Sequence, residues 1–192
     1  ATLDVIEREG WRARRDTPRI SLPEKRVDWN ADPFGDRNWT FQLHAWRPLD
    51  PFLVAYEDTG EAGHLSRAVV MCLGWEEAEA ASDNQALYWN DMGTGLRASK
   101  LGYIVYRLRR EPVLSASTTD RLVVLARRHM RRLKDPAFMG PSNHAFFQIH
   151  GLMALFQALP DSPEAEGCLA YLTEQLDKLL LDQFGVEGMH LE

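Results

Sequence analysis

Apolar residues recur at intervals of three and four through most of the chain after residue 38, and this spacing is typical of α-helices. Proline, glycine and capping residues interrupt the pattern and divide it into six predicted helices. These cover approximately residues 50–60, 62–80, 91–110, 117–134, 143–159 and 162–185. No segment shows the sustained alternation with hairpin turns that indicates β-strands. Residues 1–38 are polar and punctuated by proline, which predicts mostly extended chain with room for a short N-terminal helix.

Several helix ends are marked by their residue types. Asp50 and Pro51 are typical of a helix start, and Gly60 of a helix end. The helix that begins near residue 91 is expected to end at Glu111, because a residue that precedes proline avoids the helical region. The predicted caps of the later helices are Ser117 or Thr118, then Ser142 or Asn143, then Ser162 followed by Pro163.

The last two predicted helices differ in their apolar faces. In 143–159 the apolar side chains spread around the whole circumference, which predicts a helix buried on all sides. In 162–185 the leucines at 169, 172, 176, 179 and 180 form one stripe, which predicts a helix with one solvated side. This alternation favours an all-α fold with two layers of antiparallel helices, as in an incomplete α/α toroid, although a simple bundle would give a similar pattern. We expect residues 1–38 to pack on a helical domain formed by residues 39–192.

Composition and charge narrow the classes of protein. The 192 residues are 45% hydrophobic, which is enough for a core and argues against global disorder. The formal net charge of −6 argues against a general nucleic-acid binder. No apolar run approaches the roughly 20 residues that a membrane-spanning helix needs, so no membrane insertion is expected. The two cysteines provide no disulfide framework.

Four segments carry a resemblance to a known family. They are Asp28–Phe34 with Arg37–His44, then Trp89-Asn90-Asp91 leading to Arg97, then Ser142-Asn143-His144, and finally Gln183 with Glu187–Glu192. In this order, and with helices between them, the segments resemble the heparinase II/III-like polysaccharide lyases across nearly the whole chain. The resemblance implies an α/α toroid that precedes a β-rich C-terminal part, and an acidic polysaccharide as the partner. It also favours a bacterial protein that is periplasmic or secreted.

The resemblance implies β-elimination on a uronic-acid polysaccharide. A base removes the C5 proton, and fixed donors neutralise the neighbouring carboxylate. By resemblance Asn143 binds this carboxylate and His144 assists neutralisation or proton transfer, and both are the catalytic candidates. The start of a helix also favours an anion. Ser142 stands where the family often has a second asparagine. The alternative is that Asn143 only caps the helix and His144 is a packed core histidine.

Four other residues are candidates for substrate binding: Arg97, Trp89, Glu192 and His44. Arg97 offers a guanidinium fork for a carboxylate or sulfate, and Trp89 an aromatic face for a sugar ring. The alternatives are a buried Trp89, an Asp91 that caps its helix, Arg97 on a solvated face, and aromatic packing around His44 and Trp46.

The family's tyrosine base has no match among the tyrosines of this chain. Glu187-Gly188 and Glu192 match the start of the stretch that ends in tyrosine-histidine, so we expect the base beyond Glu192 and no activity from residues 1–192 alone. The missing C-terminal part of the same protein is then a partner. No cofactor is expected. No metal site is expected either, since His144 and His150 do not share a helix face and no His-Glu-x-x-His motif occurs.

Two features leave alternatives open. The basic side chains at 121, 127, 128, 131, 132 and 134 share one arc of the fourth predicted helix, which indicates either a polyanion track or, more often, a solvated face. His129, near the apolar edge of that helix, is expected to be packed. The competing functions are a non-catalytic helical carbohydrate-binding or scaffold module, and a toroid-type glycoside hydrolase using Asp91 and Glu192 as its two carboxylates.

Overall fold

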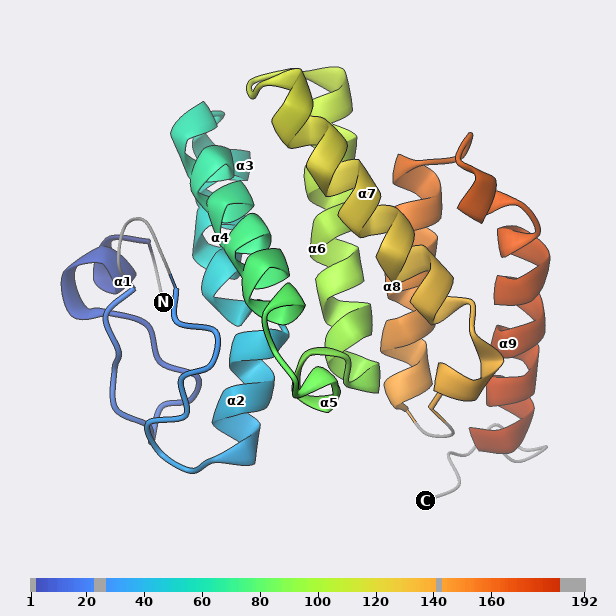
Figure 1. The fold of residues 1–192 in the computed structure, drawn as a ribbon, viewed down its shortest axis with the longest axis horizontal. Helices are drawn as coiled ribbons and strands as arrows, with labels where there is room; N and C mark the ends of the chain where they lie inside the picture. The colour runs from blue at the N-terminus through green and yellow to red at the C-terminus, as the bar shows by residue number, and fades with distance from the viewer. Residues whose placement is uncertain (1–2, 23–26, 141–142, 184–192) are drawn as a thin grey trace. The chain divides into compact units, whose positions relative to one another are not determined.

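The computed structural model describes residues 3–22, 27–140 and 143–183, and the chain divides into two compact units, residues 1–88 and 89–192 (Figure 1). The fold is all-α, as the sequence predicts. Over the described ranges every regular element is a helix, and the one β-bridge pairs Trp11 with Ile20. None of the described helices is both long and apolar enough to cross a lipid bilayer. Whether residues 39–192 form one domain stays a prediction.

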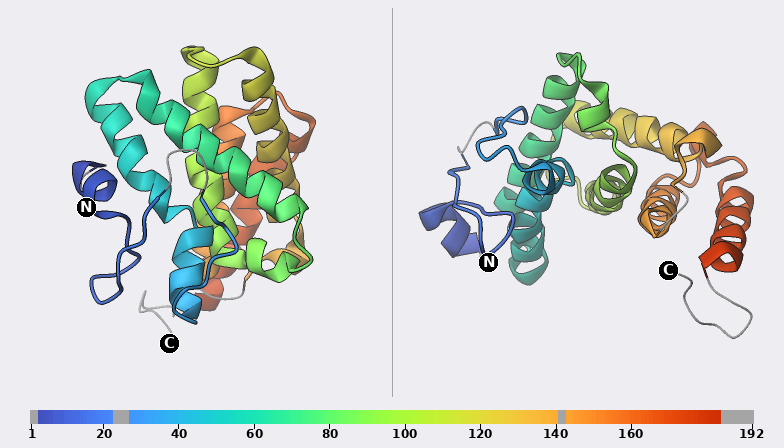
Figure 2. Two further views of the ribbon diagram at one scale, coloured as in Figure 1. Left: turned by 60° about the vertical axis from the view of Figure 1, so that its left-hand side comes forward. Right: turned by 90° about the horizontal axis from the view of Figure 1, so that it is seen from below.

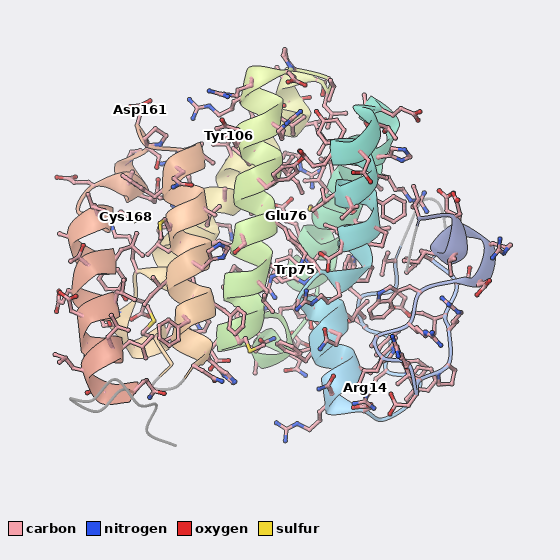
Figure 3. The ribbon with its side chains drawn as sticks, turned by 180° about the vertical axis from the view of Figure 1, so that it is seen from behind. Arg14, Trp75, Glu76, Tyr106, Asp161 and Cys168 are labelled. Carbon is pink, nitrogen blue, oxygen red and sulfur yellow. The ribbon has the colours of Figure 1, made fainter. Side chains whose placement is uncertain are left out.

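The first unit consists of short helices around one antiparallel helix pair. Its elements are α1 (Leu3–Glu9), α2 (Arg37–His44), η1 (Arg47–Leu49), α3 (Asp50–Thr59), α4 (Ala62–Ala80) and α5 (Gln85–Tyr88). Gly60 ends α3 with a φ of 71°, a left-handed conformation that glycine adopts without strain, and the chain then reverses into α4. Tryptophans 29, 39, 46 and 75 fill the core of this unit, and Figure 3 marks Trp75 among them.

The second unit consists of four long helices joined by short turns. Its elements are α6 (Asp91–Arg110), α7 (Ala116–Leu133), η2 (Pro136–Phe138), α8 (His144–Ala158), η3 (Pro163–Ala165) and α9 (Cys168–Gln183). In Figures 1 and 2, α6 and α8 lie side by side and run in the same direction, while α7 and α9 run in the opposite direction. Successive antiparallel pairs of this kind are the arrangement expected for part of an α/α toroid.

Glycines bring α6 and α8 into backbone contact. A Cβ added to Gly151 would lie 2.3 Å from the carbonyl oxygen of Gly95, and one added to Gly102 would lie 2.7 Å from the carbonyl carbon of Ala154. Only hydrogen fits at these positions, because Cβ atoms do not approach backbone atoms so closely. Since the two helices run in the same direction at this short separation, their first residues, Asp91 and His144, become neighbours.

Most of the predicted helix boundaries are confirmed, and two are wrong. Helices α3, α4 and α6 occupy the predicted ranges. The cap of α7 is Ser115, not Ser117 or Thr118: its Oγ accepts from the N–H of Thr118 at 3.2 Å. The predicted helix 162–185 is two elements, because Gly167, with a φ of 66°, separates η3 from α9. Its predicted end at Gly185 lies outside the described residues.

The burial of α8 and α9 also differs from the prediction. Helix α8 is not buried on all sides, since Phe147 and Met153 are 38% and 41% exposed. Within the second unit α6, α7 and α9 cover its other faces, and the composition of a helix does not reveal how many neighbours it has. The leucine stripe of α9 is divided: Leu172 and Leu179 are buried, whereas Leu169, Leu176 and Leu180 are exposed.

Candidate functional site

Asp91 and His144 form a hydrogen-bonded pair at the neighbouring ends of two parallel helices. Each is the first residue of its helix, α6 or α8, and His144 Nδ1 lies 3.0 Å from Asp91 Oδ2. Both side chains are partly exposed, 38% for Asp91 and 45% for His144. In the described parts of the chain no further histidine, cysteine or acidic residue joins them to form a group of three that could hold a metal ion.

The exposure of His144 removes one alternative. A packed core histidine would be buried, and this side chain is nearly half exposed. The packed histidine of the second unit is instead His129, whose side chain is completely buried, as the sequence predicts.

Asn143 precedes His144 and is exposed to solvent. It occupies the N-cap position of α8 with helical backbone angles, φ −52° and ψ −17°, and its side chain makes no capping hydrogen bond. Asn90 shows the contrasting case, because its Oδ1 accepts from the N–H of Gly93 at 2.7 Å and so caps α6. Asn143 therefore holds the cap position without performing the cap's function. Ser142, the other predicted cap, lies outside the described residues.

The loop before α8 is fixed beside the Asp91–His144 pair. Gln148 is completely buried; its Nε2 donates to the carbonyl of Phe138 at 2.9 Å, and its Oε1 accepts from the N–H of Gly140 at 2.8 Å. A Cβ on Gly140 would lie 3.2 Å from Asp91 Oδ2 and 3.5 Å from the Cβ of His144. The buried amide of Gln148 therefore fixes this loop, and the absence of a side chain at Gly140 leaves room for the Asp91–His144 pair.

Arg97 is completely buried, so the alternative of a solvated face is wrong. Its Nη2 donates to Thr94 Oγ1 at 3.1 Å, its Nε donates to His129 Nε2 at 3.4 Å, and its guanidinium carbon lies 5.6 Å from the ring centroid of Trp89. The guanidinium of Arg128 lies at the same distance from this ring. Arg97 therefore supports Trp89 from inside the protein, whereas Trp89 and Arg128 are only partly buried.

His44 lies in the core of the first unit. Its side chain is completely buried, Trp75 Nε1 donates to its Nδ1 at 3.3 Å, and its ring contacts Tyr88 with the centroids 4.7 Å apart. These contacts are the aromatic packing that the sequence offered as the alternative to substrate binding. Glu192, and the match at Glu187-Gly188, lie outside the described residues.

The basic row of α7 is joined to the turn before α9. Arg127 Nε donates to Glu164 Oε2 at 2.6 Å, and Arg131 pairs with the other oxygen of this carboxylate. Lys134 Nζ donates to the backbone carbonyls of Glu164 and Glu166 at 3.0 and 2.6 Å. The hydrogen bond from Arg127 is the main cause that lowers the pKa of Glu164. Three of the six basic residues therefore hold η3 in place and do not form an open track.

Sequence reasoning missed two histidine contacts. It considered Asp91 only as a cap or a hydrolase acid, whereas the structure pairs Asp91 with His144. It also missed Ser99, whose Oγ lies 2.9 Å from Nδ1 of the exposed His150. Asn143, Phe147 and His150 are spaced by four and three residues and are all exposed, so they share one open face of α8. This spacing is visible in the sequence and could have identified the three residues as one face of the helix.

The family model for the heparinase II/III N-terminus matches residues 13–192. No curated protein and no solved structure matches the chain.

Proposed function

Because the chain belongs to the heparinase II/III N-terminus family, we propose that it is the helical part of a polysaccharide lyase that cleaves a uronic-acid polysaccharide by β-elimination. The proposed binding site for the uronate carboxylate is the N-terminal end of α8, at Asn143 and His144. One observation carries this assignment: Asn143 is exposed at the start of the helix, and its side chain makes no capping bond there.

The chemistry requires donors at this place. The C5 proton of a uronate is a poor acid while its carboxylate is charged, so the site must neutralise the carboxylate and stabilise the charge that develops when the proton leaves. The Asn143 amide can donate to a carboxylate oxygen, and the first N–H groups of α8 and its dipole also favour an anion. In this proposal His144, the adjacent residue, assists neutralisation or proton transfer.

The other candidates take different parts in the proposal. Trp89 is partly buried and contributes an aromatic ring to the sugar-binding surface. Arg97, fully buried, supports that ring and does not contact the sugar directly. His44 belongs to the core of the first unit and is not assigned to the substrate. For Glu192 substrate binding stays a prediction.

Binding of oligouronates by the 192-residue chain tests this proposal. Isothermal titration compares oligomers from alginate or heparan sulfate with neutral oligosaccharides of the same length. We expect binding of an acidic oligomer only. Asn143→Ala should weaken it by about tenfold, because a hydrogen bond to a charged group contributes roughly 1.5 kcal/mol. The matched control is Gln157→Ala, which removes an exposed amide from the far end of α8 and should leave the affinity unchanged.

Two results would count against the proposal. Equal affinity for neutral and acidic oligomers would contradict a carboxylate-binding site. An unchanged affinity of Asn143→Ala would show that Asn143 is not part of such a site. The ultraviolet absorbance of unsaturated uronate ends, followed in the same mixtures, reports the elimination step. Its appearance supports the lyase directly, and binding without it assigns this chain the binding step alone.

A further inference from the structure

We propose that Asp91 is the positioning residue of His144, fixing the imidazole so that any contact of the ring with the substrate is made through Nε2. This inference rests on the proposed function of Asn143 and His144. It adds a residue from a different helix, 53 positions away along the chain, whose role is to determine which ring nitrogen carries the proton.

The chemistry of the two groups sets the direction of the bond. An ionised carboxylate can only accept hydrogen bonds, so the 3.0 Å contact between Asp91 Oδ2 and His144 Nδ1 requires a proton on Nδ1. This holds for the neutral ring and for the imidazolium. A histidine whose Nδ1–H is fixed by a carboxylate has a defined tautomer and ring orientation. Nε2 then accepts a proton when the ring is neutral, and donates to an anion when the ring is charged.

The carboxylate is itself held in place. Asp91 Oδ1 accepts from the N–H of Met92 at 2.6 Å, while Oδ2 faces His144. Its two oxygens therefore have different partners, and this fixes the plane of the carboxylate. Asp91 is not needed as the cap of α6, because Asn90 performs that function. The bond to His144 is therefore an additional feature of this helix start.

The surroundings leave room for this arrangement. Gly140 has no side chain where a Cβ would approach Asp91 Oδ2 to 3.2 Å, and the buried Gln148 holds the backbone of Gly140 in place. The close packing of α6 on α8 through Gly95 and Gly151 brings the two helix starts together. If the Asp91 side chain served only the start of α6, neither the missing side chain at Gly140 nor the close packing of α6 on α8 would be needed.

The ring nitrogens of His144 report the inference directly. In 15N-labelled chain, long-range proton–nitrogen correlation spectra assign the His144 ring by comparison with His144→Gln, and distinguish a protonated Nδ1 from a protonated Nε2. At a pH where the ring is neutral we expect the proton on Nδ1. Asp91→Asn should shift the population toward the Nε2–H form. The matched control is Asp50→Asn, which removes the carboxylate from the first residue of α3 and should leave the His144 signals unchanged.

The affinity for an alginate or heparan oligouronate supplies the second readout. Asp91→Asn should weaken binding by roughly fivefold, because the bond that orients the donor is worth about 1 kcal/mol. Asp91→Glu keeps a carboxylate at this position and should restore part of the affinity and of the Nδ1–H population. Gly140→Ala keeps both partners but crowds them, so it should change both readouts in the same direction as Asp91→Asn. It serves as the second test if Asp91→Asn does not fold.

The outcomes separate this inference from the proposed function. Binding that is unchanged in Asp91→Asn, or an Nε2–H tautomer in the unmodified chain, overturns the positioning role and leaves the carboxylate site standing. Failure of the unmodified chain to bind any oligouronate overturns the proposed function, and with it the role of Asp91 toward a substrate, even if the tautomer is as expected. A shift of the tautomer together with weaker binding supports both.

Discussion

Arg97 donates a hydrogen bond from its Nε to Nε2 of His129 across 3.4 Å, and both side chains are completely buried. Nδ1 of His129 lies 3.0 Å from the carbonyl oxygen of Leu125, which can only accept, so the ring carries its proton on Nδ1 and receives Arg97 on Nε2. Burial, and then the positive charge of Arg97, lowers the pKa of His129 to about 3. His129 is therefore neutral in the folded protein at every pH where the protein is normally handled.

The neutrality of His129 predicts a loss of stability in mild acid. The unfolded histidine takes up a proton below its pKa of about 6.5, whereas the folded one does so only near the pKa of about 3. Between these values the unfolded state binds more protons, so the free energy of unfolding falls as the pH falls. From pH 7 to pH 5 we expect this contribution of His129 to lower the free energy of unfolding by about 2 kcal/mol. Urea unfolding at the two pH values would measure the change.

His129→Gln isolates this contribution, because glutamine does not titrate. Between pH 7 and pH 5 we expect the free energy of unfolding of this variant to fall by about 2 kcal/mol less than that of the unmodified chain. The matched control is His150→Gln, which replaces an exposed histidine on α8 and should retain the original dependence. Parallel pH profiles for the unmodified chain and His129→Gln would contradict a neutral buried ring.

Arg97→Lys is predicted to destabilise the second unit although it preserves the charge. Lysine has no Nε–H fork for His129 and Thr94 and no planar group to stack on Trp89, so the hydrogen bonds of a buried cation are lost. We expect the free energy of unfolding to fall by about 2–3 kcal/mol. Arg110→Lys at the exposed end of α6 should change it by less than about 0.5 kcal/mol. Equal effects of the two substitutions would contradict the buried role of Arg97.

Much of the helical layout follows from the sequence, because local signals determine it. The left-handed Gly60 at the end of α3 and the Pro112 that follows Glu111 act on the backbone within a few residues, so the ends of α3 and α6 could be predicted. The α7 stripe of Leu122, Ala126 and Met130 is completely buried as its period predicts. The predicted cap of α7, Ser117 or Thr118, was wrong, because the side chain of Ser115, two residues before Ser117, caps the helix instead.

The candidate site was less predictable, because it depends on contacts between distant parts of the chain. The position of Asn143 at a helix start could be predicted, but its lack of a capping bond could not. The partner of His144 depends on how closely α6 and α8 pack, which is set by Gly95, Gly102 and Gly151. Charge likewise suggested an accessible Arg97, whereas its side chain is buried and donates to Thr94 and to His129, the latter 32 residues away.

Two glycine substitutions are predicted to have opposite effects, because only one of the two glycines lies at the contact between α6 and α8. In Gly151→Ala the new Cβ would meet the carbonyl oxygen of Gly95 at 2.3 Å, which is a backbone atom that cannot rotate away. We expect a loss of about 3 kcal/mol or more in the free energy of unfolding, because the helices must separate. In Gly63→Ala the Cβ meets nothing within 4 Å. Since alanine favours helix, this substitution should be neutral or stabilise α4 by up to about 1 kcal/mol.

Thermal unfolding followed by circular dichroism measures both glycine variants. The Gly151→Ala midpoint should fall by several degrees or more while that of Gly63→Ala stays or rises. If Gly151→Ala were as stable as the unmodified chain, α6 and α8 would not be in backbone contact, and the geometric reason for the Asp91–His144 pair would be lost.

The two N-cap asparagines offer a test of whether Asn143 serves the fold or the substrate. Asn90 accepts from the N–H of Gly93 at 2.7 Å, so Asn90→Ala should lower the free energy of unfolding by about 1 kcal/mol, the usual cost of losing a cap. Asn143 makes no such bond, so Asn143→Ala should change stability by less than about 0.5 kcal/mol while it weakens oligouronate binding. Urea unfolding of both variants at one pH makes the comparison. If Asn143→Ala lowered the free energy of unfolding as much as Asn90→Ala, Asn143 would be an ordinary cap. If Asn143→Ala kept its stability but bound the oligouronate more weakly, the result would support a contact between the Asn143 amide and the carboxylate.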